Sequence, residues 1–236
     1  MEASVQSYVD YRDYEARRVE AEHIGFLTHE LKNPIGVVMM AKDQLCETAT
    51  SPEQRKLCDL MDRSLGRLRT IIDEVLTAER LQAGAMEAHL VDLTLEDLFA
   101  DWLGALKRRA EAKHLALDLR FDPAVEIRAD PNLTRLAVEN LLDNAIKYSD
   151  EGTVSLEVDD KPDEVLFHVR DQCGGLTPQQ LAVIFEPFKR AHETKPGTGL
   201  GLSITRSAVE VHGGAIHVES SGMGCHFWFS LPKRHH

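Results

Sequence analysis

Apolar residues in the first third of the chain recur at the spacing of an amphipathic helix. They fall at Ile24, Leu27, Leu31, Val38 and Leu45, in steps of three, four and seven residues that fit one seam of a heptad repeat. The segment TATSP at 48–52 interrupts this pattern, and its proline suits the first turn of a new helix. The pattern therefore predicts two helices joined by a short loop.

The second predicted helix carries a wide apolar stripe and ends near 83–84, where a glycine can close it. One hairpin covers such a stripe poorly, so we expect a second copy of the chain to complete a dimeric four-helix bundle. The alternative is that the stripe packs on the second half of the same chain. The seam is formed by Leu57, Met61, Ser64, Leu68, Ile71 and Val75, and it is widened by Leu60, Leu65, Ile72 and Leu76.

From residue 85 onward the periodicity shortens to that of strands alternating with helices. Adjacent strands predict antiparallel hairpins across 159–163 and 221–224. We therefore expect a mixed sheet covered by helices on one face, an α/β sandwich, with the domain boundary near 84–88. The predicted strands are 89–93, 115–121, 153–158, 164–171, 215–220 and 226–231, and the predicted helices lie near 94–113, 132–148, 177–184 and 200–212.

Composition narrows the range of partners and environments. The 236 residues include 43% hydrophobic ones, enough for a core, and the formal net charge of −12 argues against generic nucleic-acid binding. The chain has no apolar run long enough to cross a membrane, and its polar start is unlike a signal peptide. The four cysteines are too sparse for a disulfide scaffold and form no CxxC pair. We therefore expect a reducing cytoplasmic location and no structural zinc.

The string FLTHELKNP at 26–34 holds the first candidate chemistry. If Leu31 occupies position a of the heptad, His29, Glu30 and Asn33 fall at f, g and c, so His29 faces solvent and Asn33 shares its face. An exposed neutral imidazole is a nucleophile near neutral pH, and a neighbouring carboxylate can hold one of its ring nitrogens. A single surface histidine is more often inert, so the whole string supports this interpretation, including Pro34, which should bend the helix.

A second candidate site begins in ENLLDNAIKYS at 139–149. The spacing places Asn140, Asn144 and Lys147 on one face of a helix, with Tyr148 beside them. An amide oxygen can bind a hard cation such as Mg²⁺. By itself this string is equally compatible with an ordinary amphipathic helix.

Two glycine-containing strings follow, RDQCGGL at 170–176 and GTGLGLS at 197–203. In the first, Asp171 ends an apolar strand, and the glycines after it allow close approach of a ligand. The second precedes a helix, where exposed N–H groups favour phosphate. The string GTGLGLS lacks the GK[ST] ending of a P-loop. No predicted βαβ unit surrounds it, which argues against a Rossmann site. Between the two strings, the polar segment 185–196 carries three basic residues and reads as a lid over a nucleotide.

Taken in order, the strings H-E-x-x-N-P, N-x-x-x-N, D-x-x-x-G, F-x-P-F and G-x-G-x-G-L resemble the sensor histidine kinases of two-component systems, over about residues 20–232. The resemblance implies three segments: a signal helix or linker at 1–22, a dimerisation and histidine-phosphotransfer hairpin at 23–84, and an ATP-binding domain of the Bergerat (GHKL) type at 85–236. It also implies ATP and Mg²⁺ as cofactors, a homodimer, and a response regulator receiver domain as partner.

The resemblance assigns roles to individual residues. His29 is expected to accept the phosphoryl group, Glu30 to activate it, and Asn33 to help water remove phosphate from the regulator. Asn144 is expected to bind Mg²⁺ with Asn140 alongside. The remaining nucleotide-site residues are Lys147 for the phosphates, Tyr148 against the nucleotide, Asp171 for the adenine amino group, and Gly175, Gly197, Gly199, Gly201 and Leu202 in the glycine motifs.

The chain departs from the family pattern at Cys173, where a glycine is expected. A side chain there would narrow the adenine pocket or strain the turn, so Cys173→Gly is expected to tighten ATP binding. This departure keeps open a second interpretation, a dimeric phosphotransfer or scaffold protein with weak or no catalysis. Other ATPases of the same fold do not require H-E-L-K-N-P on a preceding hairpin, which makes them poorer candidates.

Overall fold

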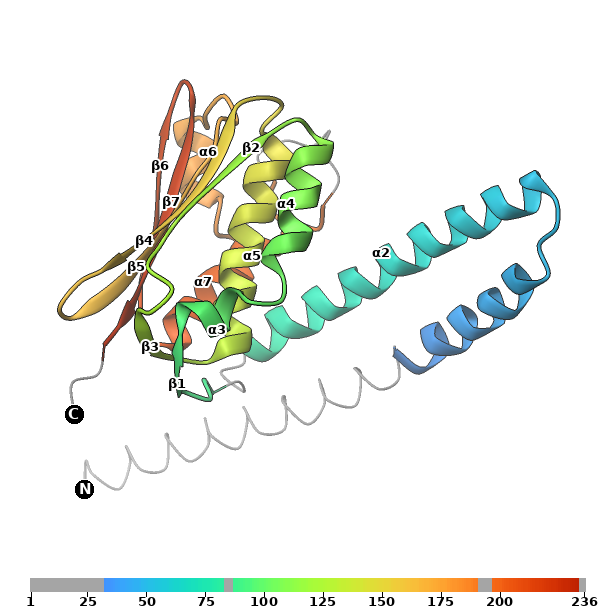
Figure 1. Ribbon diagram of the computed structural model, residues 1–236, viewed down its shortest axis with the longest axis horizontal. Coiled ribbons are helices and arrows are strands. Elements are labelled where there is room, and N and C mark those ends of the chain that lie inside the picture. The colour runs from blue at the N-terminus through green and yellow to red at the C-terminus, as the bar shows by residue number, and fades with distance from the viewer. Residues whose placement is uncertain (1–31, 83–86, 191–196, 234–236) are drawn as a thin grey trace, which may run out of the picture. The chain divides into compact units, whose positions relative to one another are not determined.

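The computed structural model describes residues 32–82, 87–190 and 197–233 (Figure 1). The chain divides into two compact units, Met1–Met86 and Glu87–His236, which are described separately below. Among the described helices, none combines the length and the apolar character needed to cross a membrane.

The first unit contains a helix over 32–47 and the helix α2 over Pro52–Gln82. Helix α2 begins where Ser51 Oγ accepts the backbone N–H of Gln54 at 3.2 Å, while Gln54 Oε1 accepts the backbone N–H of Ser51 at 3.0 Å. This reciprocal pair is a capping box, and Pro52 follows it at the first helical position. The second helix, the short loop and the part of the first helix from residue 32 onward are therefore confirmed, while the predicted start of the first helix near residue 24 lies outside the described residues. Lys42 is nearly buried and pairs with Asp62 across the hairpin.

A disulfide joins Cys46, near the end of the first helix, to Cys58 on α2. The expectation that the cysteines remain reduced is therefore wrong for this pair. The turn at 48–51 folds the second helix back on the first, so residues separated by 12 positions come to a Cα–Cα distance of 5.8 Å. That distance lies within the range a disulfide spans. Cysteine density alone carries no information about such a pairing.

The second unit is a mixed sheet with helices on one face (Figure 1). Its five strands run in the order β2-β4-β5-β7-β6, with β2 parallel to β4 and the other pairs antiparallel. The hairpins β4–β5 and β6–β7 are those predicted from the sequence. The strands are β2 (Ala116–Arg120), β4 (Thr153–Asp160), β5 (Glu164–Arg170), β6 (Ile216–Ser221) and β7 (Gly224–Pro232), and the helices are α3 (Leu95–Phe99), α4 (Leu103–Ala112), α5 (Pro131–Tyr148), α6 (Pro178–Val183) and α7 (Gly201–Val211).

Two local predictions in this unit were wrong. The stretch 94–113 is divided into α3 and α4, because Thr94 caps a short first helix and residues 100–102 turn before the second begins. A strand at Glu126–Ala129, β3, was missed, and it pairs with β1 (Val91–Thr94) in a separate two-stranded sheet. Strand β3 has only four residues, too few for its alternation to stand out from a loop.

The core lies between the sheet and the helical layer. Phe167 of β5 and Phe229 of β7 are fully buried and stack with ring centroids 4.7 Å apart. Leu141 and Leu142 of α5 are buried in the same cluster. The alternate residues of each strand point to the opposite face, where His168, Arg170 and their neighbours are polar. This alternation fixes which side of the sheet receives α5 and α7.

Candidate functional site

Helix α5 is anchored at both ends by residues from elsewhere in the second unit. At its start, Asp130 Oδ1 accepts the N–H groups of Asn132 and Leu133 at 2.9 and 3.0 Å. The backbone N–H of Asp130 donates to Nε2 of the buried His212 at 2.9 Å, which ties α5 to the end of α7. At its other end, Lys113 Nζ donates to the carbonyls of 146, 147 and 149 at 2.7–3.1 Å. These contacts fix the helix that carries the first group of candidate residues.

One face of α5 lies against the glycine segment that precedes α7. Asn140 Nδ2 donates to the carbonyl of Gly201 at 3.1 Å. A Cβ on Gly197 would come within 2.5 Å of Lys147 Nζ, so the backbone there approaches the lysine as closely as a glycine permits. The segments 139–149 and 197–203, about fifty residues apart in sequence, are thus brought together. This proximity is what a single nucleotide site formed by both segments requires.

The other candidate residues of α5 and α7 complete this face. Lys147 Nζ lies 4.7 Å from the ring centroid of Tyr148, a cation–π contact. Asn144 and Tyr148 are both half-buried, and so is Leu202, which packs against the core. The face therefore presents a lysine, an aromatic ring and amide groups to one region, a combination suited to a nucleotide.

The loop after β5 holds the carboxylate of Asp171 in a fixed place. Its Oδ1 accepts the backbone N–H groups of Cys173 at 3.1 Å and Cys225 at 2.9 Å. The N–H of Gln172 donates to Ser149 Oγ at 3.2 Å, which connects this loop to the end of α5. Gly175 has φ +85°, and a Cβ there would collide with the carbonyl of Ser221. Glycine is therefore required at 175 both for the backbone conformation and for space.

Cys173 does not strain the turn, which corrects part of the sequence-based expectation. Among the described residues, the non-glycine positions with positive φ are His114 and Phe188, and in this loop Gly174 and Gly175 adopt that conformation. The Cys173 side chain is half-buried against the core, with Sγ 3.1 Å from Sγ of Cys225. The Cys173 side chain is thus accommodated by packing. The positive φ angles that the turn requires are adopted by Gly174 and Gly175, which follow it.

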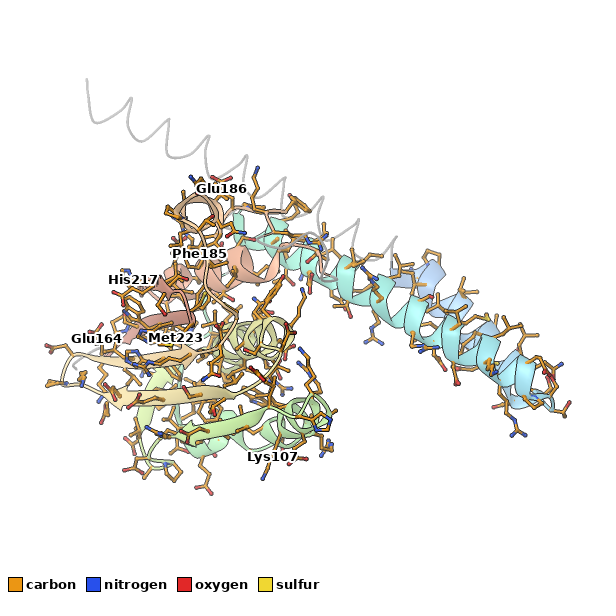
Figure 2. The ribbon with its side chains drawn as sticks, turned by 90° about the horizontal axis from the view of Figure 1, so that it is seen from above. Lys107, Glu164, Phe185, Glu186, His217 and Met223 are labelled. Atoms are coloured by element: carbon orange, nitrogen blue, oxygen red, sulfur yellow. A yellow bond between two sulfur atoms is a disulfide. The ribbon has the colours of Figure 1, made fainter. Side chains whose placement is uncertain are left out.

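The candidate phosphoacceptor string is only partly within the described residues. His29 and Glu30 lie outside them, so their expected roles stay predictions. Asn33 is exposed in the first turns of the 32–47 helix. The expected lid is described up to residue 190; Phe185 and Glu186 follow α6 (Figure 2), and the backbone N–H of Phe188 donates to the carbonyl of Gly199 at 3.0 Å. That bond connects the segment to the glycine string.

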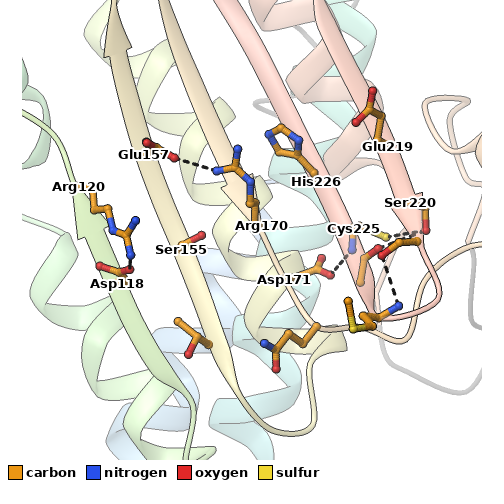
Figure 3. A pocket seen from close by; sticks show the side chains of 15 residues that line it. Asp118, Arg120, Ser155, Glu157, Arg170, Asp171, Glu219, Ser220, Cys225 and His226 are labelled. Carbon is orange, nitrogen blue, oxygen red and sulfur yellow. Dashed lines mark hydrogen bonds and ion pairs between the residues drawn. The ribbon is translucent and has the colours of Figure 1, made fainter.

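Sequence reasoning missed a polar hollow of about 740 Å³ on the open face of the sheet (Figure 3). Arg170 pairs there with Glu157 at 2.9 Å. Beside this pair, Nδ1 of His168 lies 3.1 Å from Nε2 of His226, and burial lowers the pKa of both imidazoles below the ordinary value of 6.5. Because the two histidines belong to strands distant in sequence, their contact has no local signal.

Two known families match the chain, one in each of the two compact units. Residues 20–84 match the family described as the His Kinase A (phospho-acceptor) domain. Residues 129–235 match the family described as Histidine kinase-, DNA gyrase B-, and HSP90-like ATPase. The two matches include every candidate residue discussed above.

Individual proteins that resemble the chain include two sensor proteins and one solved structure. The chain is 31% identical to the alginate biosynthesis sensor protein KinB of Pseudomonas aeruginosa, over 97% of this chain and 39% of that protein. It is 32% identical to the adaptive-response sensory kinase SasA of Synechococcus elongatus, over 98% of this chain and 64% of that protein. The structure of full-length ShkA in complex with AMPPNP is similar with a TM-score of 0.78 and 30% identity, over 90% of this chain and 46% of that one. The chain thus spans only part of these relatives.

Proposed function

Because the chain belongs to the sensor histidine kinases of two-component systems, we propose that it uses ATP to phosphorylate its own His29. The phosphoryl group then passes to an aspartate of a response regulator receiver domain. The observation that carries this proposal is the contact between Asn140 and Gly201, which joins the asparagine helix to the glycine segment in one site. The Asp171 loop is connected to the same helix through Ser149. The reaction belongs in the cytoplasm, where ATP and receiver proteins are present.

The residues of the second unit divide the work of holding a nucleotide. Asp171 accepts the adenine amino group, Tyr148 lies against the nucleotide, and Lys147 and the glycine N–H groups meet the phosphates. Asn140 donates its amide nitrogen to Gly201, so its amide oxygen stays available as an acceptor. The amide oxygens of Asn140 and Asn144 suit a hard cation, and Mg²⁺ bound there neutralises charge on the triphosphate.

The first unit supplies the acceptor. The sequence pattern predicts that His29 faces solvent and that Glu30 holds its ring with one nitrogen free for attack; both residues lie outside the described part of the chain. Positioning and neutralisation of charge account for most of the catalysis, since the transferred phosphoryl group needs little covalent help. Asn33, four positions later in the sequence, is exposed, and its amide assists water in removing phosphate from the regulator. The hairpin at 23–84 thus serves both the phosphorylation of the regulator through His29 and the removal of phosphate from it through Asn33.

The dimer of hairpins is supported by apolar residues that one copy leaves exposed. Leu45, Leu57 and Leu60 are 65%, 59% and 55% exposed, and all three lie on the predicted seam or its widened stripe. A second copy would remove this surface from water, at about 25 cal/mol per Å² buried. We expect Leu60→Lys to shift the molar mass measured by light scattering from dimer toward monomer. Leu60→Met, which keeps an apolar side chain of similar volume at the same position, should leave the dimer intact.

The decisive experiment labels the protein with γ-labelled ATP. Wild type should acquire an acid-labile, alkali-stable label, and His29→Ala should acquire none. His23→Ala is a matched control in the same segment and should retain the label. Adding a receiver domain should then remove the label from the kinase and place it on the receiver.

The alternative, a scaffold with weak or absent catalysis, rests on Cys173 alone. It predicts no label on wild type and a gain of nucleotide affinity in Cys173→Gly. A labelled wild-type protein excludes it. An unlabelled one that still binds ATP by calorimetry would favour it over the kinase.

A further inference from the structure

Two free cysteines lie in contact beside the Asp171 carboxylate. Cys173 follows β5 and Cys225 is the second residue of β7, and they are 52 residues apart in sequence. Their Sγ atoms are 3.1 Å apart, and both backbone N–H groups donate to the same oxygen of Asp171. The pair is therefore held together by the main chain as well as by the contact between the side chains.

The surrounding glycines keep this arrangement tight. A Cβ on Gly224 would collide with the carbonyl of Asp171, and one on Gly175 would collide with the carbonyl of Ser221. The loop 171–175 and the β6–β7 hairpin thus approach each other as closely as bare backbone allows. A disulfide needs its sulfurs at about 2.05 Å, so about 1 Å of further approach is required, within reach of side-chain rotation.

We propose that Cys173 and Cys225 are a modification site, a dithiol that oxidises reversibly to an intramolecular disulfide. The oxidant is a low-molecular-weight disulfide. The thiolate of Cys225 attacks one of its sulfurs, releasing one small thiol and leaving a mixed disulfide. The sulfur of Cys173 then attacks Cys225, loses its proton to solvent, and releases the second small thiol. The protein gives up two electrons and two protons, and the small disulfide is reduced to two thiols.

The environment favours Cys225 as the attacking sulfur. The hydrogen bond from Cys173 lowers the pKa of Cys225, and burial works in the opposite direction. Ser220 Oγ lies 3.5 Å from the same sulfur. The Cys225 side chain is only 4% exposed and belongs to the core cluster, whereas Cys173 beside it is half-buried, so a small oxidant approaches the pair from the side of Cys173. Thiolate character and access are the two conditions for exchange.

The same three side chains, Asp171, Cys173 and Cys225, also have ligand atoms within 4.8 Å of one another, as a metal site would. The sulfur separation argues against that use. Two thiolates on a tetrahedral zinc ion, each at about 2.3 Å, lie about 3.8 Å apart. The observed 3.1 Å is shorter, and Asp171 Oδ1 is already occupied by two backbone donors. The geometry is closer to a disulfide precursor than to a zinc ligand set.

The test uses the full chain, reduced and then placed in glutathione buffers of increasing oxidised fraction with EDTA. Thiols are blocked by alkylation, and tryptic peptides are identified by mass spectrometry without reduction. We expect peptide 171–189 linked to peptide 207–233, about tenfold or more in excess of any other pairing of these two cysteines. Cys173→Ser should instead leave Cys225 as a glutathione adduct. The link between 43–55 and 57–63, from the other disulfide, is an internal control.

Two results would overturn the inference. One is alkylation of both Cys173 and Cys225 under conditions in which the Cys46–Cys58 link forms completely. The other is a zinc ion retained by the native protein without EDTA, with both thiols protected from oxidation and from alkylation.

The rate of disulfide formation with and without ADP distinguishes a failure of this inference from a failure of the proposed function. Only the expected effect of ADP rests on the proposed function. If adenine binds at Asp171, ADP should slow the cross-linking about threefold or more by covering the loop. Cross-linking at an unchanged rate would leave the disulfide established and count against the placement of adenine at Asp171.

Discussion

Asp171 has two roles that a single substitution can separate. Its Oδ1 accepts the N–H groups of Cys173 and Cys225, and in the proposed function its carboxylate also accepts the amino group of adenine. In Asp171→Asn, the amide oxygen still serves the two backbone donors. The negative charge is lost, and an NH₂ donor replaces the second oxygen. The fold is therefore retained while the adenine amino group meets another donor.

The magnitude follows from the bonds affected. A hydrogen bond to a charged group contributes about 1.5–3 kcal/mol. At about 1.4 kcal/mol per tenfold, Asp171→Asn should raise the nucleotide Kd about 10–100-fold. Asp171→Ala additionally deprives two half-buried N–H groups of their acceptor, which we set at about 2 kcal/mol of unfolding free energy. For a unit of this size, that loss lowers Tm by about 4–8 °C.

Calorimetric titration with ATP and thermal unfolding of each variant measure the two effects independently. Glu157→Gln is the matched control, because it removes a carboxylate from the same sheet that pairs only with Arg170 among the contacts described. It should leave nucleotide affinity unchanged. The reasoning fails if Asp171→Asn binds ATP within threefold of wild type, or if it is destabilised as much as Asp171→Ala.

Three other predictions concern stability. Lys113→Met removes three bonds to carbonyls at the end of α5 and should cost about 1–3 kcal/mol by thermal unfolding, whereas Lys107→Met, on the exposed face of α4 (Figure 2), should cost nothing measurable. Cys58→Ser opens a loop of 12-residue separation and should cost the hairpin about 3 kcal/mol in denaturant; an equal effect of reductant on wild type and variant would contradict this. Burial lowers the pKa of His168 and His226, so the unfolded chain takes up protons first as pH falls, and the unfolding free energy should decrease from about pH 7 to pH 5. Replacing both histidines by glutamine should flatten that slope, and an unchanged slope would exclude them as its source.

The parts of the fold that were predicted correctly are those encoded by local periodicity. Apolar residues recur at steps of three, four or seven along the two helices of the hairpin, and β4 and β5 alternate every second residue. Each pattern reports which face of one element is apolar. The capping sequences reinforce it, as Ser51 and Pro52 do at the start of α2. Where the pattern was too short, as in β3, or continuous across a turn, as at 94–113, the prediction failed.

Within the candidate site, the sequence identified the residue types but not their neighbours. Asn140, Lys147 and Asp171 were found because polar groups on apolar elements, and glycines after a strand or before a helix, suit a nucleotide. That Asn140 meets Gly201, 61 residues away, depends on how α5 and α7 pack on one sheet. The anchoring of α5 by Lys113 was missed for the same reason, since a lysine in a loop carries no signal of what its ammonium contacts.

The sequence by itself determined most of the elements, their apolar faces and the chemistry available along them. Only the tertiary structure decided which distant groups touch: Cys46 with Cys58, Cys173 with Cys225, and His168 with His226. The physical reason is that periodicity records whether a side chain leaves water, a property of one element. A contact depends on the register and packing of two elements, and these are set by the whole core.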